Sequence, residues 1–409
     1  MKCRFCRTKL NHIFIDLGKT PLANSYLTEE QINKAELFYP LRVYVCSKCF
    51  LVQIDEFESS KKIFSNYAYF SSYSQTWLNH AKDFVNKTIK RFNINDTNLI
   101  IEIASNDGYL LQYFKKENIP VLGIEPAINV AKVAKEKKIP TISKFFGQKT
   151  ANELVRNGKK ADLLIAFNVL PHVPNLIDFI KGLKKLLNSK GVIIIQFSAY
   201  LLTLIQKTEF DTIYHEHFSY FSLFTLQKIF HKYNLEIFDM EELNIHGGSM
   251  RLYIKHLENK DVVISNNVLQ KIKKEKKFGL TNISTYTTFS DKVNISKRKI
   301  WQFFIDAKCK RKTVVAYGAA AKGNTLLNYC GIGRDFINYT VDLNPYKQNL
   351  FLPGTHIPIL KPQMISKTKP DYVIILAWNF KDEIMKQVKF IKKWGGKFVV
   401  LVPMVKVFS

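Results

Sequence analysis

The segment NLIIEIASNDGYLLQYFKKENIPVLGIEPAINVAKVAKEKKIP, residues 98–140, decides the fold. Its two apolar runs, LIIEI and VLGIE, are typical of buried parallel strands, and each is followed by a run with the apolar spacing of a helix. The segment therefore predicts strand, turn, helix, strand and helix, with Glu125 at the end of the second strand. In such a unit the ligand lies at the carboxyl ends of the strands, where an acid accepts hydrogen bonds from ribose hydroxyls.

The turn after the first strand bears on the cofactor. A dinucleotide fingerprint, G-x-G-x-x-G, needs several glycines so that the backbone can approach a pyrophosphate. This turn has only Gly108, and Ala104 stands where a first glycine would be. It favours S-adenosylmethionine, which has no pyrophosphate, over NAD, with another nucleotide-dependent α/β enzyme as the alternative. The residues expected to contact the cofactor are Glu102, Ala104, Asn106, Gly108, Tyr109, Glu125, Pro126, Asn168 and Val169.

The following segments extend this unit. Strands are expected at residues 161–173 and 191–197, with a helix at residues 176–189 between them. The pattern predicts a doubly wound α/β sheet, as methyltransferases have.

The C-terminal part repeats the order of strand, turn and helix. A mostly helical connector is expected up to residue 312, and further parallel strands at residues 371–380 and 397–403. Small residues keep the first turn of this unit tight, and Lys322 follows where a helix N-terminus would meet an anion such as a diphosphate. This half-sheet either binds a sugar nucleotide or braces the central domain.

Four of the six cysteines stand as two C-x-x-C pairs, Cys3 with Cys6 and Cys46 with Cys49. Each pair can wrap a short loop around one metal ion, and two pairs complete the tetrahedral four-thiolate set that binds zinc. Such a closed set leaves no open coordination position, so the predicted zinc is structural. The alternative is a redox pair, but neither pair lies in a thioredoxin-like pattern.

Composition and charge limit the class of protein. The chain has 409 residues, enough for two or three domains, and 46% of them are apolar. The net charge of +27 comes mostly from dispersed lysines, which is typical of solvated surfaces, although a nucleic-acid-binding protein is an alternative. No apolar run reaches the ~18–20 residues of a membrane span, and the N-terminus has no signal-peptide pattern. We therefore expect a cytoplasmic protein without disulfides that binds neither a membrane nor nucleic acid.

The segment FDTIYHEHFSYFS, residues 210–222, crowds histidines, acids and tyrosines together. Such a run suits a metal site, an acid–base site or a polar surface loop. Two imidazoles two positions apart would need a bend in the chain to converge on one metal ion, and no H-E-x-x-H zinc helix is present. An acid–base site is favoured, because histidine titrates near neutrality. His215 is expected to be the structural histidine of the pair.

Six further motifs follow the cysteine pairs in order: YFSSYSQTW (69–77), EIASNDG (102–108), NVLPHVPN (168–175), YHEHFSYFS (214–222), HGGSMR (246–251) and YGAAAKGNTLLNYCGI (317–332). Together they resemble the motifs of sugar C-methyltransferases that act on nucleotide-activated keto-deoxysugars. The resemblance covers nearly the whole chain. It implies a zinc module at 1–75, an S-adenosylmethionine domain at 76–260, the connector at 261–312 and a Rossmann-like sugar-nucleotide domain at 313–409.

The reaction implied by the resemblance is methyl transfer to C3 of a 4-keto sugar. The ketone acidifies the C3–H bond, so a base can form an enolate that takes up the methyl group. By the same resemblance His217 is the general base, Glu216 orients or binds the substrate, Tyr214 assists, His172 faces the same cleft and Tyr69 closes over it. An O- or N-methyltransferase with the same architecture is the alternative.

The resemblance also implies a nucleotide-linked sugar as the binding partner and is compatible with a monomer. For the turn HGGS, which the resemblance places beside the substrate, a plain hairpin is the alternative. The residues expected to bind the substrate are Gly248, Ser249, Arg251, Gly318, Lys322, Asn324, Thr325, Asp342 and Asn344.

Overall fold

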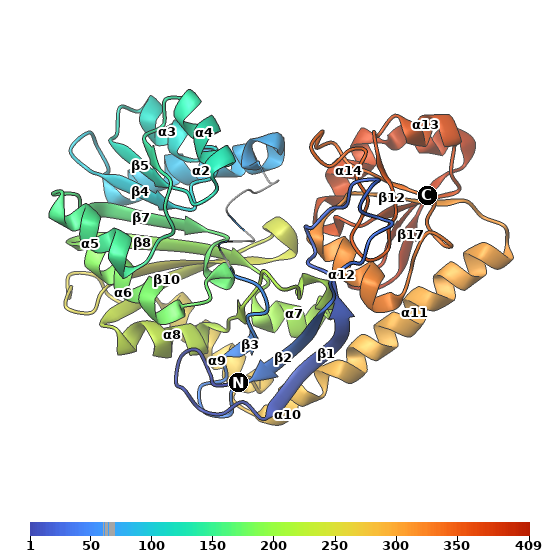
Figure 1. The fold of residues 1–409 in the computed structure, drawn as a ribbon. Coiled ribbons are helices and arrows are strands. Elements are labelled where there is room, and N and C mark those ends of the chain that lie inside the picture. Colours follow the sequence, from blue (N-terminus) through green and yellow to red (C-terminus); the bar gives the residue numbers. More distant parts are fainter. Residues whose placement is uncertain (60, 62–63, 65–69) are drawn as a thin grey trace.

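The computed structural model describes residues 1–59, 61, 64 and 70–409, which form two lobes with an N-terminal sheet below and between them (Figure 1). The described residues build sheets of four, seven and six strands. These sheets belong to the N-terminal module, the central domain and the C-terminal domain, so the predicted α/β architecture is confirmed. Within the described ranges, no helix combines the length and the apolarity that a bilayer crossing requires.

The N-terminal module is an antiparallel sheet that borrows a strand from the central domain. Its own strands are β1 (His12–Thr20), β2 (Tyr39–Val45) and β3 (Val52–Ile54). The fourth strand, β9 (Ser219–Tyr220), pairs with β3, with Val52 opposite Tyr220. The YHEHFSYFS segment is therefore attached to the cysteine-containing module.

The central domain contains the expected doubly wound sheet. Its elements are η1 (Ser71–Tyr73), α2 (Gln75–Phe92), β4 (Ile100–Ile103), α3 (Leu111–Lys116), β5 (Val121–Ile124), α4 (Ile128–Glu136), β6 (Thr141–Ile142), α5 (Gln148–Arg156), β7 (Ala161–Phe167), η2 (Leu170–His172), α6 (Leu176–Leu186), β8 (Leu187–Ser198), α7 (Leu201–Lys207), η3 (Phe210–Thr212), α8 (Leu223–Lys232), β10 (Leu235–Leu243), η4 (Ile245–Gly247) and β11 (Ser249–His256). The strand order is β10-β11-β8-β7-β4-β5-β6. The strands from β8 to β6 are parallel, whereas β11 and β10 are antiparallel. Every residue of β4 is buried, as in a sheet that helices cover on both faces.

The connector and the C-terminal domain complete the chain. Their elements are α9 (Asn266–Phe278), α10 (Ile283–Thr287), α11 (Phe289–Cys309), β12 (Val314–Tyr317), α12 (Ala321–Cys330), β13 (Thr340–Val341), β14 (Ile359–Leu360), α13 (Met364–Thr368), β15 (Tyr372–Ile375), η5 (Trp378–Phe380), α14 (Lys381–Gln387), η6 (Lys389–Trp394), β16 (Lys397–Val400) and β17 (Lys406–Phe408). The sheet order is β14-β13-β12-β15-β16-β17, and only β17 is antiparallel to its neighbour. The long helix α11 packs against β1 and links the two lobes (Figure 1).

The end of the YHEHFSYFS segment is held firmly where α8 begins. The hydroxyl of Ser222 caps this helix by accepting from the backbone N–H of Thr225 at 3.1 Å. The first two backbone N–H groups of α8 donate to the buried carboxylate of Glu275 on α9, both at 2.7 Å. Strand pairing and this cap therefore fix the side chains that precede them.

Candidate active site

A cavity of about 750 Å³ lies where the three parts of the chain meet. It falls within the range of about 300–1,000 Å³ that is usual for small-molecule sites. The ends of β4, β5 and β7 line it, together with Tyr214, Glu216 and His217 and the start of α12. The loop after β1 reaches it with Asn24, so no single domain forms the cavity alone.

Glu125, at the end of β5, lines one end of the cavity. Its carboxylate accepts hydrogen bonds from the backbone N–H groups of Asn106 at 2.9 Å and Ala127 at 2.8 Å. Burial raises the pKa of Glu125 to about 7. Each carboxylate oxygen keeps a lone pair, so ribose hydroxyls can still donate to it. This arrangement fits the adenosyl part of S-adenosylmethionine.

The turn after β4 has the tight backbone that this position requires. Ala104 and Asn106 have φ values of 52° and 49°, and Gly108 has φ 76°. A Cβ on Gly108 would lie 2.9 Å from the Ile139 side chain, so only glycine fits there without a shift. The aromatic rings of Trp77 and Tyr109, with centroids 5.7 Å apart, add an apolar wall. Tyr109 is among the residues predicted to contact the cofactor, whereas Trp77 was missed.

Most residues predicted to contact the cofactor face this cavity. Glu102 does not, because it lies fully buried within β4, where burial raises its pKa well above the usual value. Gly108 belongs to the turn after β4 but does not line the cavity. The predicted cofactor residues that line the cavity are Ala104, Asn106, Tyr109, Glu125, Pro126, Asn168 and Val169.

The four cysteines of the N-terminal module converge as the spacing predicts. Their sulfur atoms all lie within 4.8 Å of one another, with Cys3 and Cys49 at 3.5 Å and Cys6 and Cys46 at 3.4 Å. Zinc bound tetrahedrally with Zn–S bonds of about 2.3 Å places sulfurs about 3.8 Å apart, so the set fits one zinc ion. None of these cysteines lines the cavity, which agrees with a structural metal.

The imidazole of His217 is held in one tautomer. Its Nδ1 lies 2.8 Å from the carbonyl oxygen of Thr212, which can only accept, so Nδ1 carries the proton. The hydroxyl of Tyr214 therefore donates to Nε2 at 2.8 Å. Burial, with the neighbouring His172, lowers the pKa of His217 well below its usual value. A neutral ring with an unprotonated Nε2 in the cavity is the protonation state that a general base needs.

His172 and Glu216 complete the wall around His217. The rings of His172 and His217 have centroids 4.7 Å apart, and Nδ1 of His172 donates to the Glu216 carbonyl oxygen at 2.8 Å. Burial lowers the pKa of His172 to about 4. The side-chain amide of Asn24 donates to a carboxylate oxygen of Glu216 at 2.7 Å. Asn24 was missed from the sequence, because no motif surrounds it.

His215 points away from this group, as expected for a structural histidine. Its Nε2 lies 3.2 Å from the carbonyl oxygen of Pro40, and its ring makes edge contacts with Tyr39 and Phe57. Because His215 and His217 diverge, they do not form a metal site together. Among the described residues, the cluster suited to a metal is the set of four cysteines.

Lys322 reaches the same cavity from the C-terminal domain. Its ammonium lies 4.6 Å from the centroid of the Trp378 ring. The carboxylates of Asp211 and Glu209, which are buried in the central domain, interact electrostatically with it. The indole N–H of Trp378 donates to Asp211 at 2.6 Å. Sequence reasoning found Lys322 but missed these partners, since they are far apart in the chain.

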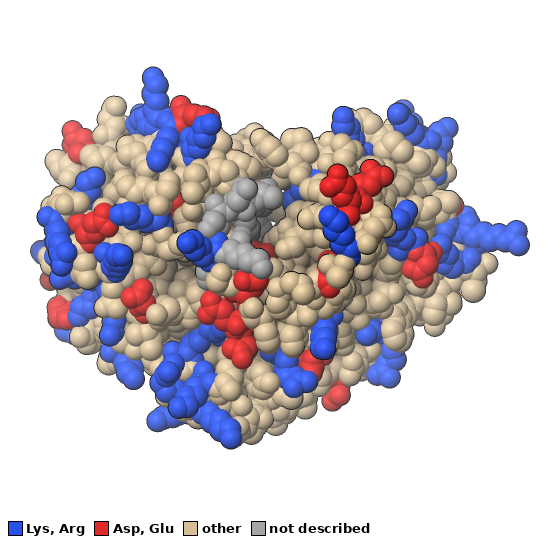
Figure 2. Space-filling model, viewed as in Figure 1, with Lys and Arg blue, Asp and Glu red and all other residues tan. Residues whose placement is uncertain are grey.

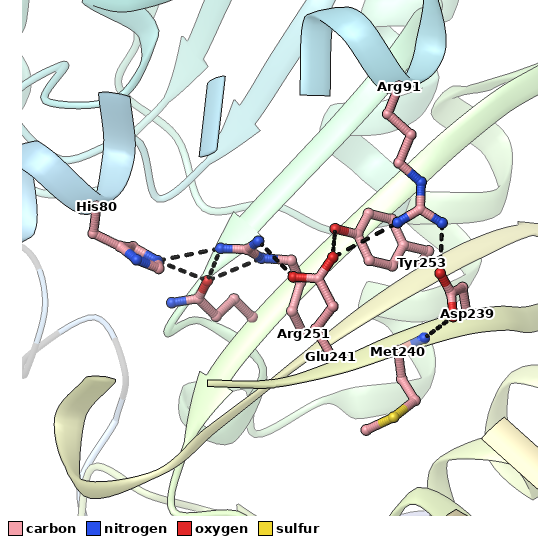
Figure 3. A network of polar contacts seen from close by, with 8 residues as sticks. His80, Arg91, Asp239, Met240, Glu241, Arg251 and Tyr253 are labelled. Carbon is pink, nitrogen blue, oxygen red and sulfur yellow. Dashed lines mark hydrogen bonds and ion pairs between the residues drawn. The ribbon is translucent and has the colours of Figure 1, made fainter. Parts of the chain in front are cut away.

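Arg251, predicted to bind substrate, lies in a buried network on the central sheet (Figure 3). Its guanidinium donates to Gln196 at 2.8 Å and pairs with Glu241 at 3.0 Å. It also contacts His80, and Arg91 extends the network along β10 (Figure 3). The charge of Arg251 is thus already paired within the domain, and its side chain does not line the cavity.

The turn HGGS lies at the interface of the lobes, where η4 packs against η5. Gly247 and Gly248 have φ values of 86° and 132°, and a Cβ on Gly247 would lie 2.4 Å from the Trp378 ring. Gly248 and Ser249 do not line the cavity. Tyr69, predicted to close over the site, lies outside the described residues.

The remaining predicted substrate residues belong to the C-terminal domain and do not line the cavity themselves. Gly318 has φ 99° at the end of β12. Asp342 accepts from the backbone N–H groups of Ala319 and Asn344, each at 2.8 Å, and so holds two loops together. Asn324 and Thr325 are buried within α12 and do not line the cavity. A second lysine, Lys347, lines it and donates to the Ala319 carbonyl oxygen at 2.8 Å.

The large positive charge is dispersed over the face that Figure 2 shows. Lysines and arginines lie over both lobes with acidic side chains among them (Figure 2). This distribution agrees with the prediction that the +27 charge reflects solvated surfaces.

The fold and the site define an S-adenosylmethionine-dependent methyltransferase with a structural four-thiolate zinc module. Family models match in the same order: "Putative zinc binding domain" at residues 3–64, "Methyltransferase domain" at 77–239 and "C-methyltransferase C-terminal domain" at 244–403. The C-methyltransferase NovU of Streptomyces niveus is 31% identical over 408 residues, 100% of this chain and 97% of the relative. The chain belongs to this family of C-methyltransferases.

Solved structures match up to about half of the chain. Magnesium protoporphyrin IX methyltransferase of Synechocystis PCC 6803 with bound SAM covers 43% of this chain and 78% of its own, at 15% identity and a TM-score of 0.33. A protein of Pyrococcus horikoshii OT3 covers 49% and 99%, at 14% identity and a TM-score of 0.37.

Proposed function

We propose that this C-methyltransferase acts on a nucleotide-linked 4-keto-deoxysugar and methylates C3. The observation that carries the proposal is the neutral, oriented imidazole of His217, with Nε2 in a cavity that runs from the cofactor end to the C-terminal half-sheet. Transfer to carbon requires a carbon nucleophile, and a ketone next to a C–H bond allows a histidine to generate one. S-adenosylmethionine supplies the methyl group when bound.

His217 has the central chemical role in this proposal. Its Nε2 takes the C3 proton while the electron pair of the C–H bond moves toward the ketone oxygen. The Thr212 carbonyl, which accepts from Nδ1, stabilises the imidazolium that results. Tyr214 must turn its hydroxyl away from Nε2 when substrate enters, and it then becomes a donor to the sugar. His172 and Glu216 form the wall beside the ring that is methylated.

The nucleotide part is proposed to lie on the C-terminal wall. The beginning of α12 faces the cavity there, and Lys347 offers a cation for a diphosphate. Gly318, Asp342 and Asn344 hold the loops of this wall in place and are proposed to shape the nucleotide site. All of these residues come from one chain, so we propose that a monomer is active.

The test supplies the full-length protein with labelled S-adenosylmethionine and a panel of nucleotide-linked 4-keto sugars. Mass spectrometry should detect one added methyl group and loss of a deuterium placed at C3. Retention of that deuterium in a methylated product would replace the proposal by O- or N-methylation. No methylation of any 4-keto sugar would exclude this substrate class.

A further inference from the structure

The acids beside Lys322 belong to the turn that orients His217. Glu209 and Asp211 lie next to or within η3, and the carbonyl oxygen that fixes His217 belongs to Thr212 of the same turn. Lys322 lies in the other lobe, on the first turn of α12. The packing of the two lobes therefore places an ammonium group and the proposed base in one cavity.

The position of Lys322 is determined from both lobes. Trp378 packs its ring against the ammonium and donates its indole N–H to Asp211. Burial lowers the pKa of Lys322, while Asp211 and Glu209 act in the opposite direction and favour the charged form. A cation held in this way needs little reorganisation to meet negative charge that develops in the cavity.

Lys322 lies on α12, which packs against η3, and the carbonyl oxygen of Thr212 in η3 holds the ring of His217. The positive charge of Lys322 acts on His217 and contributes to lowering its pKa, after burial and His172. Lys347 instead donates to the Ala319 carbonyl and packs on the ring of Tyr26, at 5.2 Å from its centroid. The two lysines of the C-terminal wall thus have different neighbours, Trp378 and two acids for Lys322 and the Ala319 carbonyl and Tyr26 for Lys347.

A buried imidazole is a weak base. It can remove the C3 proton only if the negative charge left by the C–H electron pair is stabilised on the atom that receives it. That atom is the ketone oxygen, which gains negative charge as the C3–H bond breaks. A donor aimed at such an oxygen in a cavity shielded from water is typically the largest single contribution to rate.

We propose that Lys322 is a catalytic residue that hydrogen-bonds the ketone oxygen of the substrate and stabilises the enolate, rather than binding the diphosphate. The inference rests on the proposed function. The C3 proton goes to Nε2 of His217, and the pair of the C3–H bond becomes the C3–C4 π bond as the carbonyl π pair moves onto oxygen. Lys322 keeps its proton throughout. When C3 takes up the methyl group, the C3–C4 π pair forms the new C–C bond and a pair on the oxygen restores the C=O bond. The bond between the methyl group and sulfur breaks, and its pair stays on the sulfur of the S-adenosylhomocysteine that leaves.

The experiment separates proton removal from methyl transfer. The full-length protein, with S-adenosylhomocysteine bound, is incubated in D₂O with a nucleotide-linked 4-keto sugar, and deuterium entering C3 is measured by mass spectrometry. Methyl transfer is measured in parallel with S-adenosylmethionine. The variants are Lys322→Met and Lys322→Gln, with Lys347→Met as the control that removes another cation from the same wall. Binding of S-adenosylhomocysteine shows which variants are folded, and either Lys322 variant that binds it is decisive.

We expect both Lys322 variants to lower kcat and the exchange rate at saturating substrate by about 10²–10³-fold, as for loss of one oxyanion donor. Lys347→Met should raise KM and leave the exchange rate at saturation close to that of the wild type. If the Lys322 variants only raise KM, Lys322 binds the diphosphate and the inference is wrong. An equal loss of exchange in Lys347→Met would also overturn it, since total charge would then be the cause. Wild-type protein that neither exchanges nor methylates any 4-keto sugar would overturn the proposed function and this inference with it.

Discussion

Replacing His217 by asparagine tests its role as base with little change of shape. The asparagine amide can donate to the Thr212 carbonyl in place of Nδ1, which lies 2.8 Å from it, but offers no basic nitrogen in place of Nε2. Loss of a positioned base costs about 10²–10⁴-fold in rate. At 1.36 kcal/mol for each factor of ten, this equals about 3–5 kcal/mol of transition-state stabilisation.

The pH dependence follows from the direction of the pKa shift. Burial and His172 lower the pKa of His217 well below its usual value, so its ring is neutral near pH 7 and can accept a proton. Wild-type kcat should therefore stay level as the pH falls through the usual histidine range of about 6.5. It should decrease only at lower pH, where the imidazole becomes protonated. His217→Asn should lack this decrease.

The assay measures transfer of labelled methyl groups at saturating cofactor and sugar, from about pH 5 to pH 9 to bracket the histidine pKa. His215→Asn is the matched control, because His215 belongs to the same segment but contacts the carbonyl of Pro40 on the other side. We expect the control to keep kcat close to the wild-type value. A kcat for His217→Asn within tenfold of the wild type, or a wild-type decrease centred above pH 6.5, would refute the assignment of the base.

Three further predictions concern the cofactor, the interface of the lobes and the zinc module. Burial raises the pKa of Glu125 to about 7, and we predict that ribose hydroxyls donate to its ionised form. Calorimetry should then show S-adenosylhomocysteine affinity decreasing as the pH falls below 7. Glu125→Gln should remove that dependence, and a dependence that persists would assign it to another group. Gly247→Ala places a Cβ 2.4 Å from the Trp378 ring and should cost about 1–3 kcal/mol more than Gly158→Ala, where φ is also positive but nothing lies within 4 Å. Equal shifts of both variants in thermal unfolding would show that the ring moves freely. Cys46→Ser should lose zinc, measured by elemental analysis, and lose methyl transfer because β9 pairs with the same module. Full activity without zinc would contradict this coupling.

Local patterns in the sequence were enough to predict those parts of the protein whose structure depends on residues close together in the chain. The cysteine spacing predicts the four-thiolate site, because two short loops around one metal need few residues. The apolar runs of residues 98–140 predict parallel strands, since strands buried on both faces must be apolar throughout. The end of the second strand marks Glu125. The motif YHEH marks an acid–base segment, and the family resemblance singles out His217 within it. These features are confirmed in position by the fold, while the roles of the side chains stay predictions.

Only the tertiary structure decided which of these parts form one site. Lys322 interacts with Asp211, although more than 100 residues separate them in the chain. Asn24 of the N-terminal module donates to Glu216 of the central domain. Such contacts leave no periodic trace in the sequence, because they depend on how the lobes close and on β9 joining a distant sheet. The structure likewise places the buried Arg251 in an ion pair with the partly exposed Glu241, since an enclosed guanidinium needs a counterion close by.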